Sequence, residues 1–180
     1  MLAAAACGGD GGGGDGEETT DSTTPSTTTA PTTTLDEATR KEEAAQAAFL
    51  AYYDAFFEAA AEPVNPELPR LQELMTGDQQ RIVTRNLEAM RTNGQATRLP
   101  ANSQRRQDPR IVELQADGSV HVTSCEIDDS VVYDVNTGAV VNDDVVTNTI
   151  SATLVEEAGQ WKIVFSERTD TAPGMVACDF

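Results

Sequence analysis

The sequence that decides the fold begins at Val120 and alternates apolar and polar residues almost to the C-terminus: VHVTSCEIDDSVVYDV (residues 120–135), NTG, AVVNDDVVTNTISATLVEE (139–157), AG and QWKIVFSERT (160–169). Residues 111–115, IVELQ, show the same period before the pair Asp117-Gly118. Successive side chains of a strand point to opposite faces, and short Gly-containing segments form hairpin turns. The pattern therefore predicts a four-stranded antiparallel meander, with a bend or bulge near Asp128-Asp129.

Two of these strands indicate which face of the sheet is buried. A half-buried strand carries apolar residues at every second position. The residues that we expect on the inner face are Val146, Asn148, Ile150, Ala152 and Leu154 in the third strand, and Trp161, Ile163 and Phe165 in the last.

A long first helix is predicted upstream of the sheet. Thr34 and Glu37 form a capping box at its start, and Pro63 ends it near Glu62. Five of the nine aromatic residues lie at positions 49–57, so this helix is expected to supply much of the core. Its apolar stripe, at three- and four-residue spacing, is Ala45, Phe49, Tyr52, Tyr53, Phe56 and Ala60.

Two shorter helices are predicted to follow. Pro66 begins one that reaches about Met75, because proline is favoured at the first helical position. Thr76 and Gln79 form a second capping box, which begins a helix that ends at Asn93-Gly94. The buried face of this last helix is expected to be Val83, Leu87 and Met90.

The first 35 residues differ in composition from the rest. Small apolar residues precede Cys7, and GGDGGGGDG (8–16) follows it. This arrangement resembles the end of a bacterial lipoprotein signal peptide, which implies that residues 1–7 are a signal-peptide remnant and that Cys7 carries a lipid. The alternative is a disordered N-terminus with a chance cysteine. Residues 8–35, rich in Gly and Asp and then in Thr, Ser and Pro, predict a disordered tether, and residues 36–180 a single domain.

The chain is strongly acidic, with a formal net charge of −18 at pH 7. A protein of this charge is not expected to bind nucleic acid. No apolar run approaches the ~18 residues needed to cross a bilayer, so membrane attachment is expected through Cys7. Seven arginines between Arg81 and Arg110 suit a phosphate or carboxylate, but we favour their facing the protein's own acidic sheet.

Two further cysteines, Cys125 and Cys178, remain within the predicted domain. In an exported protein an even pair indicates a disulfide, which is our prediction. A metal site and a redox pair are the alternatives, and neither a CxxC motif nor a nearby histidine supports them.

Three helices followed by a meander, with CEIDDS (125–130), Thr137-Gly138, GQWKI (159–163) and Cys178, resemble the nuclear transport factor 2-like (cystatin-like) domains of actinobacterial envelope proteins. Some relatives are associated with mammalian-cell-entry transport systems. The resemblance implies an α+β fold, in which N-terminal helices pack on a curved, cone-shaped, four-stranded antiparallel sheet. The residues expected to line the cone are Phe49, Tyr52, Tyr53, Phe56, Trp161, Ile163 and Phe165.

Candidate catalytic residues are few. Enzymes of that superfamily use carboxylates, Tyr or His inside the cone, so Tyr52, Tyr53 and Asp54 are a candidate acid–base set, and His121 a candidate general base. We favour plainer interpretations, in which the tyrosines belong to the core and His121 is a surface or structural residue. No cofactor is expected, and no metal, because the acidic pairs 128–129 and 143–144 lack EF-hand spacing.

The function that these features predict is non-catalytic. We expect an extracytoplasmic lipoprotein that binds a small apolar ligand in the cone or docks an envelope protein. An isomerase- or dehydratase-like enzyme of the same fold and a purely structural partner in an envelope transport complex are the alternatives. A deep cavity lined by polar titratable groups would favour the enzyme, and a filled cone with an exposed apolar patch would favour docking.

Overall fold

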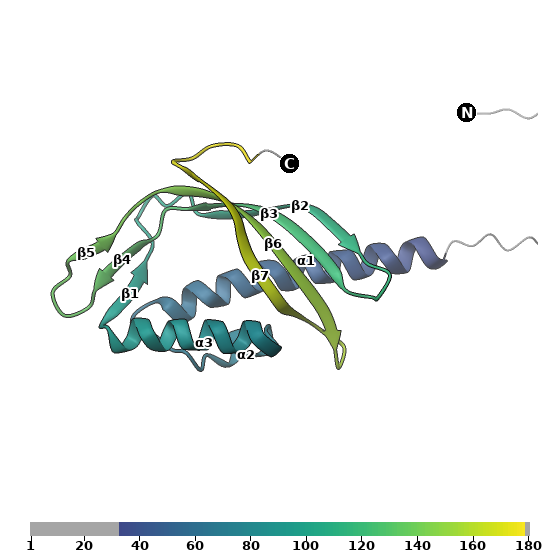
Figure 1. Cartoon of the computed structure of the whole chain (residues 1–180), viewed down its shortest axis with the longest axis horizontal. Coiled ribbons are helices and arrows are strands. Elements are labelled where there is room, and N and C mark those ends of the chain that lie inside the picture. The colour runs from purple at the N-terminus through teal and green to yellow at the C-terminus, as the bar shows by residue number, and fades with distance from the viewer. Residues whose placement is uncertain (1–32, 179–180) are drawn as a thin grey trace, which may run out of the picture. The chain divides into compact units, whose positions relative to one another are not determined.

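The computed structural model describes residues 33–178, where three helices precede seven strands (Figure 1). The helices are α1 (Thr33–Ala60), α2 (Pro69–Glu73) and α3 (Gly77–Thr92). The strands are β1 (Gln95–Arg98), β2 (Arg106–Leu114), β3 (Val120–Asp128), β4 (Val131–Asp134), β5 (Val140–Asn142), β6 (Val146–Glu157) and β7 (Gln160–Pro173). Cys7 and most of the predicted tether lie outside the described residues.

The strands form two antiparallel sheets. The larger sheet has the order β2-β3-β6-β7, and the smaller has the order β1-β4-β5. Helix α1 contacts β2, β3 and β7, and α3 contacts β7. We call the face of the larger sheet that packs against these helices the inner face. The core lies there, and its largest fully buried side chains include Phe49, Leu71, Met75, Leu87, Leu154 and Ile163.

The predicted fold class is wrong. The sequence pattern and the family resemblance led to N-terminal helices on one curved, cone-shaped, four-stranded sheet, whereas the described strands number seven and divide between two sheets. The segment 120–135 is two strands, β3 and β4, which belong to different sheets. The segment 139–157 is likewise divided into β5 and β6. The short strand β1, which was not predicted, completes the smaller sheet.

Side-chain oxygens that accept backbone hydrogen bonds explain these divisions. Asp128 accepts from the backbone N–H of Ser130 at 2.9 Å, which turns the chain between β3 and β4. The buried carboxylate of Asp129 accepts from the Ser103 hydroxyl and the Gln104 N–H instead of continuing a strand. The Asn142 side chain accepts from the Asp144 N–H at 2.7 Å and ends β5 in the same way.

The helices differ from the predictions in their ends. Helix α1 begins at Thr33, and α2 begins at Pro69 rather than at Pro66. Thr76 is the N-cap of α3 as predicted, but its hydroxyl donates to Glu157 and makes no capping bond. None of the helices within residues 33–178 is long and apolar enough to span a membrane.

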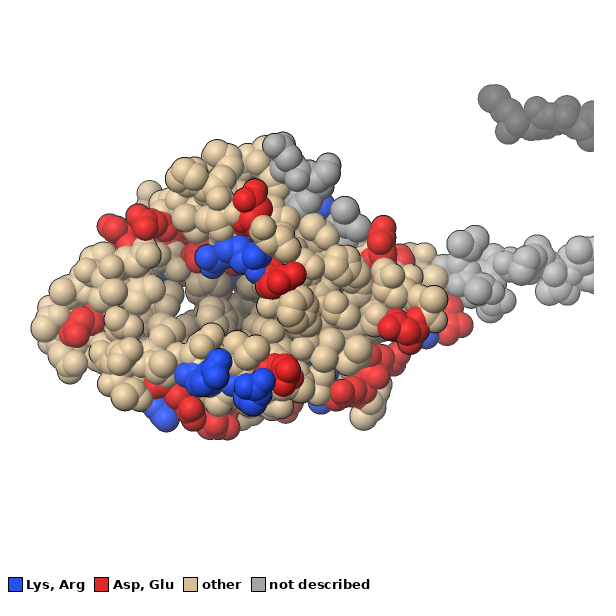
Figure 2. All heavy atoms as spheres, in the orientation of Figure 1, with Lys and Arg blue, Asp and Glu red and all other residues tan. Residues whose placement is uncertain are grey.

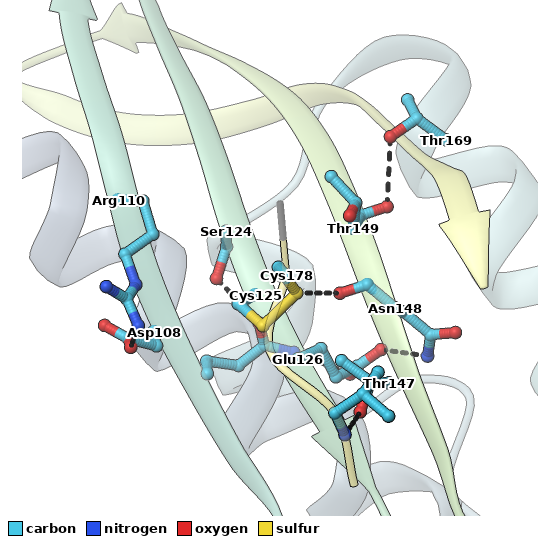
Figure 3. Close-up of a disulfide and its surroundings, with 12 residues drawn as sticks. Asp108, Arg110, Ser124, Cys125, Glu126, Thr147, Asn148, Thr149, Thr169 and Cys178 are labelled. Atoms are coloured by element: carbon cyan, nitrogen blue, oxygen red, sulfur yellow. Dashed lines mark hydrogen bonds and ion pairs between the residues drawn. A yellow bond between two sulfur atoms is a disulfide. The ribbon is translucent and has the colours of Figure 1, made fainter. Parts of the chain in front are cut away.

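The predicted disulfide between Cys125 and Cys178 is present (Figure 3). Because Val120 and Val122 face the core, Cys125 lies on the opposite, outer face of β3. The segment after β7 returns across this face, where the Thr147 hydroxyl donates to the Gly174 carbonyl and accepts from the Val176 N–H. The bridge therefore fastens the C-terminal segment to the outer face of the larger sheet.

Candidate functional site

A pocket of about 330 Å³ lies between the helices and the inner face of the larger sheet. Figure 2 shows a hollow on the face in view, between β7 and α3 of Figure 1, with basic and acidic side chains around it. We call this cavity the inner pocket. It is lined by Tyr52, Tyr53 and Phe56 of α1, by Asp78, Gln79, Ile82, Val83 and Asn86 of α3, and by Glu126, Asp128, Ile150 and residues 164–168 of the sheet.

Two neighbouring tyrosines form the helical wall of the inner pocket. Tyr52 and Tyr53 are 4% and 9% exposed, and their rings meet edge to face at 5.0 Å between centroids. Gln79 donates to the Tyr52 hydroxyl at 2.9 Å, while its side-chain oxygen accepts from the Ser166 N–H at 3.1 Å. The Tyr53 and Ser166 hydroxyls are 3.2 Å apart and hydrogen-bonded. One glutamine thus ties α1 and α3 to β7 at the pocket wall.

Burial raises the pKa of both tyrosines. Desolvation raises the pKa of Tyr52 to about 12, and the Gln79 hydrogen bond lowers it only in part. Desolvation also raises the pKa of Tyr53, more strongly, against the lowering effect of Ser166. At neutral pH these hydroxyls are hydrogen-bond donors and acceptors, and not bases.

Glu126 is the buried acid of the inner pocket, at 5% exposure. Gln107 donates to its Oε1 at 2.6 Å, and Asn148 donates to its Oε2 at 2.8 Å. Ser124 and Thr171 in turn bond to the side-chain oxygens of Gln107 and Asn148. This polar network fixes the orientation of the carboxyl group.

Burial also raises the pKa of Glu126. Desolvation has the largest effect; the Asn148 hydrogen bond opposes it, the nearby charge of Asp128 adds to it, and Arg168 and Arg105 oppose it. Neither Arg105 nor Arg168 forms an ion pair with the Glu126 carboxylate, and no other described Lys, Arg or His does. The carboxyl group therefore faces the pocket without a charged partner in contact.

The candidate catalytic residues are not brought together. Asp54 follows the tyrosines in α1 but is exposed, and its carboxylate pairs with Arg105 at 3.0 Å. The guanidinium of Arg105 in turn stacks on the Phe57 ring at 4.1 Å. The Tyr/Asp set is thus not assembled, because the Asp54 side chain lies on the exposed side of α1 whereas Tyr52 and Tyr53 are buried.

His121 is also remote from the inner pocket. It alternates with the core residues Val120 and Val122, so its side chain lies on the outer face of β3. There its Nε2 is 3.5 Å from the Thr123 hydroxyl. The histidine therefore cannot act on a ligand in the pocket.

The residues predicted to line one cone are divided between three places. Tyr52, Tyr53 and Phe56 line the inner pocket, Phe49 and Ile163 are fully buried in the core, and Trp161 borders a separate hollow beside α2. Phe165 also lines the inner pocket but is 48% exposed. A bulge between Ile163 and Phe165 breaks the alternation of β7, so that Ser166 and Arg168 take the inner positions.

Glu126, Gln79 and Ser166 were not predicted as site residues from the sequence. A signal for Glu126 was available, since Ser124 and Glu126 continue the alternation of the core residues Val120 and Val122. No such signal existed for Ser166, because its direction depends on the bulge in β7.

Two arginines of the segment between Arg81 and Arg110 form ion pairs with acids close to them in the sequence. Arg81 pairs with Asp78 at 3.0 Å and Arg110 with Asp108 at 2.7 Å. Among residues 33–178, no group of three or more His, Cys, Asp or Glu side chains is placed to hold a metal ion.

A comparison with solved structures finds a similar fold. The intermembrane space region of the chloroplast protein ARC6 superposes with a TM-score of 0.58 at 18% sequence identity, over 71% of this chain and 95% of that one. No family model matches the sequence, and no curated protein does. At this identity the likeness is one of fold.

Proposed function

We propose that this protein is a lipid-anchored, extracytoplasmic binding module of the cell envelope, and that its domain takes a small molecule into the inner pocket. The observation that carries the proposal is the pocket itself. Hydrogen-bonding groups of α1, α3 and β7 and the acid of β3 line one cavity of about 330 Å³. A concave site with a few oriented polar groups among aromatic side chains is the usual form of a small-molecule site.

Three observations support the placement outside the cytoplasm. The Cys125–Cys178 disulfide suits an oxidising compartment, since cytosolic thiols are kept reduced. The position of Cys7 before a Gly/Asp run suits lipidation. By analogy, the solved region of similar fold is named for an intermembrane space.

The lining of the inner pocket changes the expected ligand. An apolar ligand was expected, yet the pocket carries Glu126, two tyrosine hydroxyls, Gln79 and Ser166. An apolar molecule there would leave the remaining acceptor positions of the Glu126 carboxylate and the hydrogen-bond donor of the Tyr52 hydroxyl without a partner. The ligand is therefore one with polar groups as well as an apolar part.

An acid–base enzyme is the second candidate, because the inner pocket is lined by titratable groups. Glu126 would replace Asp54 or His121 as the partner of Tyr52 or Tyr53. Two features favour binding over catalysis: amide donors occupy both Glu126 oxygens, and neither tyrosine hydroxyl is hydrogen-bonded to Glu126.

The binding proposal is tested with protein purified from its own membranes. Native mass spectrometry should detect a non-covalent small molecule on the wild-type domain. Asn86→Trp puts bulk on an exposed residue that lines the inner pocket, and should remove that ligand. Arg85→Trp, on an exposed neighbour outside the lining, is the matched control and should keep it. An identical ligand load on both variants would place the binding elsewhere.

The anchor is tested separately. Cys7→Ser in the full precursor should move the protein from the membrane fraction to the soluble fraction, with Ser22→Ala in the predicted tether as control. Unchanged partitioning of Cys7→Ser would contradict lipidation at this residue without affecting the binding proposal.

A further inference from the structure

We infer that the inner pocket selects a small organic cation, a protonated or quaternary amine, whose positive charge sits beside Glu126. The inference deepens the proposed binding function and rests on it. It follows from the charges of the lining, from the absence of an ion-pair partner for the Glu126 carboxylate among the described residues, and from the aromatic rings that line the pocket.

The charges that line the inner pocket are unequal. The lining holds four carboxylates, those of Asp78, Glu126, Asp128 and Glu167, and a single guanidinium, that of Arg168. Asp78 already pairs with Arg81, outside the lining, which leaves three carboxylates against one guanidinium. Only Glu126 among these acids is deeply buried, at 5% exposure. A buried charge is screened less by salt and water than an exposed one, so Glu126 has the strongest effect on a ligand inside.

The Glu126 carboxylate has room for one more partner. Gln107 and Asn148 each donate one hydrogen bond to it, whereas two carboxylate oxygens offer about four acceptor positions. Both amide groups are neutral, and no described Lys, Arg or His forms an ion pair with this carboxylate. A cation is the ligand that would supply the missing counter-charge.

The aromatic lining suits the same ligand. Tyr52, Tyr53 and Phe56 lie along one side of the pocket. Aromatic rings attract organic cations through their quadrupole, and this attraction strengthens when water is excluded. Rings also cover the methyl or methylene groups that such a cation carries. An anion would find these rings and Glu126 unfavourable, since the lining offers it Arg168 alone and the nearby Arg105 already pairs with Asp54.

Tyr52 offers one additional contact. Its hydroxyl accepts a hydrogen bond from Gln79, and no described residue accepts the hydrogen bond that this hydroxyl can donate. The side chain is 4% exposed and lines the pocket, so an oxygen of the ligand is a suitable acceptor.

The inference is tested with three probes of similar shape: phenyltrimethylammonium, its uncharged isostere tert-butylbenzene, and benzenesulfonate. Two-dimensional ¹H–¹⁵N NMR of the tether-free domain, with its folding checked by the dispersion of the amide signals, reports both affinity and location. We expect the cation to shift the amides of the Tyr52–Phe56 and Ser166–Arg168 segments, and to bind at least about tenfold more tightly than the other two, which corresponds to about 1.4 kcal/mol.

Charge variants give opposite expectations. Glu126→Gln should weaken phenyltrimethylammonium binding about tenfold, whereas Glu156→Gln, an exposed acid outside the pocket, should leave it unchanged. Arg168→Gln removes the one positive charge of the lining and should tighten cation binding. Because Arg168 is exposed, this variant remains informative even if Glu126→Gln fails to fold.

Several results would overturn the inference. Tighter binding of tert-butylbenzene, or of benzenesulfonate with loss in Arg168→Gln, would mean a different ligand class and leave the binding function standing. If none of the probes shifts the pocket amides, the cation assignment is wrong, and a native ligand lost in Asn86→Trp would still support the proposed function. Weaker cation binding in Arg168→Gln would also contradict the inference that the pocket selects a cation.

Discussion

Glu126 illustrates how one residue can limit stability at neutral pH. Its carboxyl group is buried beside two tyrosines and Asp128, and desolvation raises its pKa above the ordinary value of 4.5. The folded protein therefore binds a proton more readily than the unfolded chain does. Between the unfolded and folded pKa values, the free energy of unfolding falls as the pH rises.

The first prediction concerns this pH dependence. In urea unfolding experiments between about pH 4 and pH 8, the free energy of unfolding of the wild type should fall relative to that of Glu126→Gln as the pH passes 4.5 and the raised pKa. The difference between the two proteins is the readout, because the glutamine also changes the hydrogen bonds from Gln107 and Asn148. Parallel curves for the two proteins would mean that Glu126 has an ordinary pKa in the folded state.

Gln79 is the second residue with a local role that can be measured. Its amide serves two groups at once, the Tyr52 hydroxyl and the Ser166 N–H. Gln79→Ala should lower the free energy of unfolding by about 1–3 kcal/mol, because buried polar groups lose their partner. Glu88→Ala, on the exposed side of the same helix, should change it by less than about 0.5 kcal/mol. Both variants are measured by thermal and urea unfolding. If Gln79→Ala lowered the free energy of unfolding no more than Glu88→Ala, the Gln79 bridge would contribute nothing.

At the scale of elements, the sequence predicted local structure better than strand pairing. The aromatic stripe of α1 and the Ala158-Gly159 turn between β6 and β7 were predicted, and both turn residues have positive φ, as such a two-residue hairpin requires. The fold class was wrong because periodicity does not reveal where a strand leaves one sheet for another. That change depends on Asp129, whose partners Ser103 and Gln104 are about 25 residues earlier in the chain.

The inner pocket was predictable from the sequence only in part, for the same reason. Tyr52 and Tyr53 were identified from the helix stripe, which is a local pattern. Asp54 was grouped with them by adjacency, yet it pairs with Arg105, 51 residues away. The groups that do meet the tyrosines come from α3, β3 and β7, and their meeting depends on the complete fold.

The third prediction concerns the junction between β3 and β4. Asp129→Ala should lower the free energy of unfolding by about 1–3 kcal/mol, since it removes the acceptor for Ser103 and Gln104. The exposed Asp143→Ala carries the same charge change and should have little effect. Hydrogen exchange should quicken first in β1 and β4, which form the smaller sheet. Unchanged exchange there would contradict the proposed cause of the division.

For the whole molecule, the disulfide is the feature with the largest expected effect. The bridge closes a loop between residues that are 53 positions apart, so it restricts the unfolded chain strongly. The fourth prediction is that Cys125→Ser with Cys178→Ser lowers the free energy of unfolding by up to about 4 kcal/mol in the chain-entropy model. Wild-type protein in reductant should match the double variant. A loss below about 1 kcal/mol would mean that the reduced chain keeps the same restriction by other contacts.

The bridge has one further consequence, which concerns proteolysis. Residues 136–144 are all exposed, and they lie within the covalent ring that Cys125 and Cys178 close. A protease that cuts once in this segment leaves Cys125 on one fragment and Cys178 on the other. The nicked protein therefore gains a single water and remains one covalent molecule, and its two halves separate on a denaturing gel only after the sulfur–sulfur bond has been reduced.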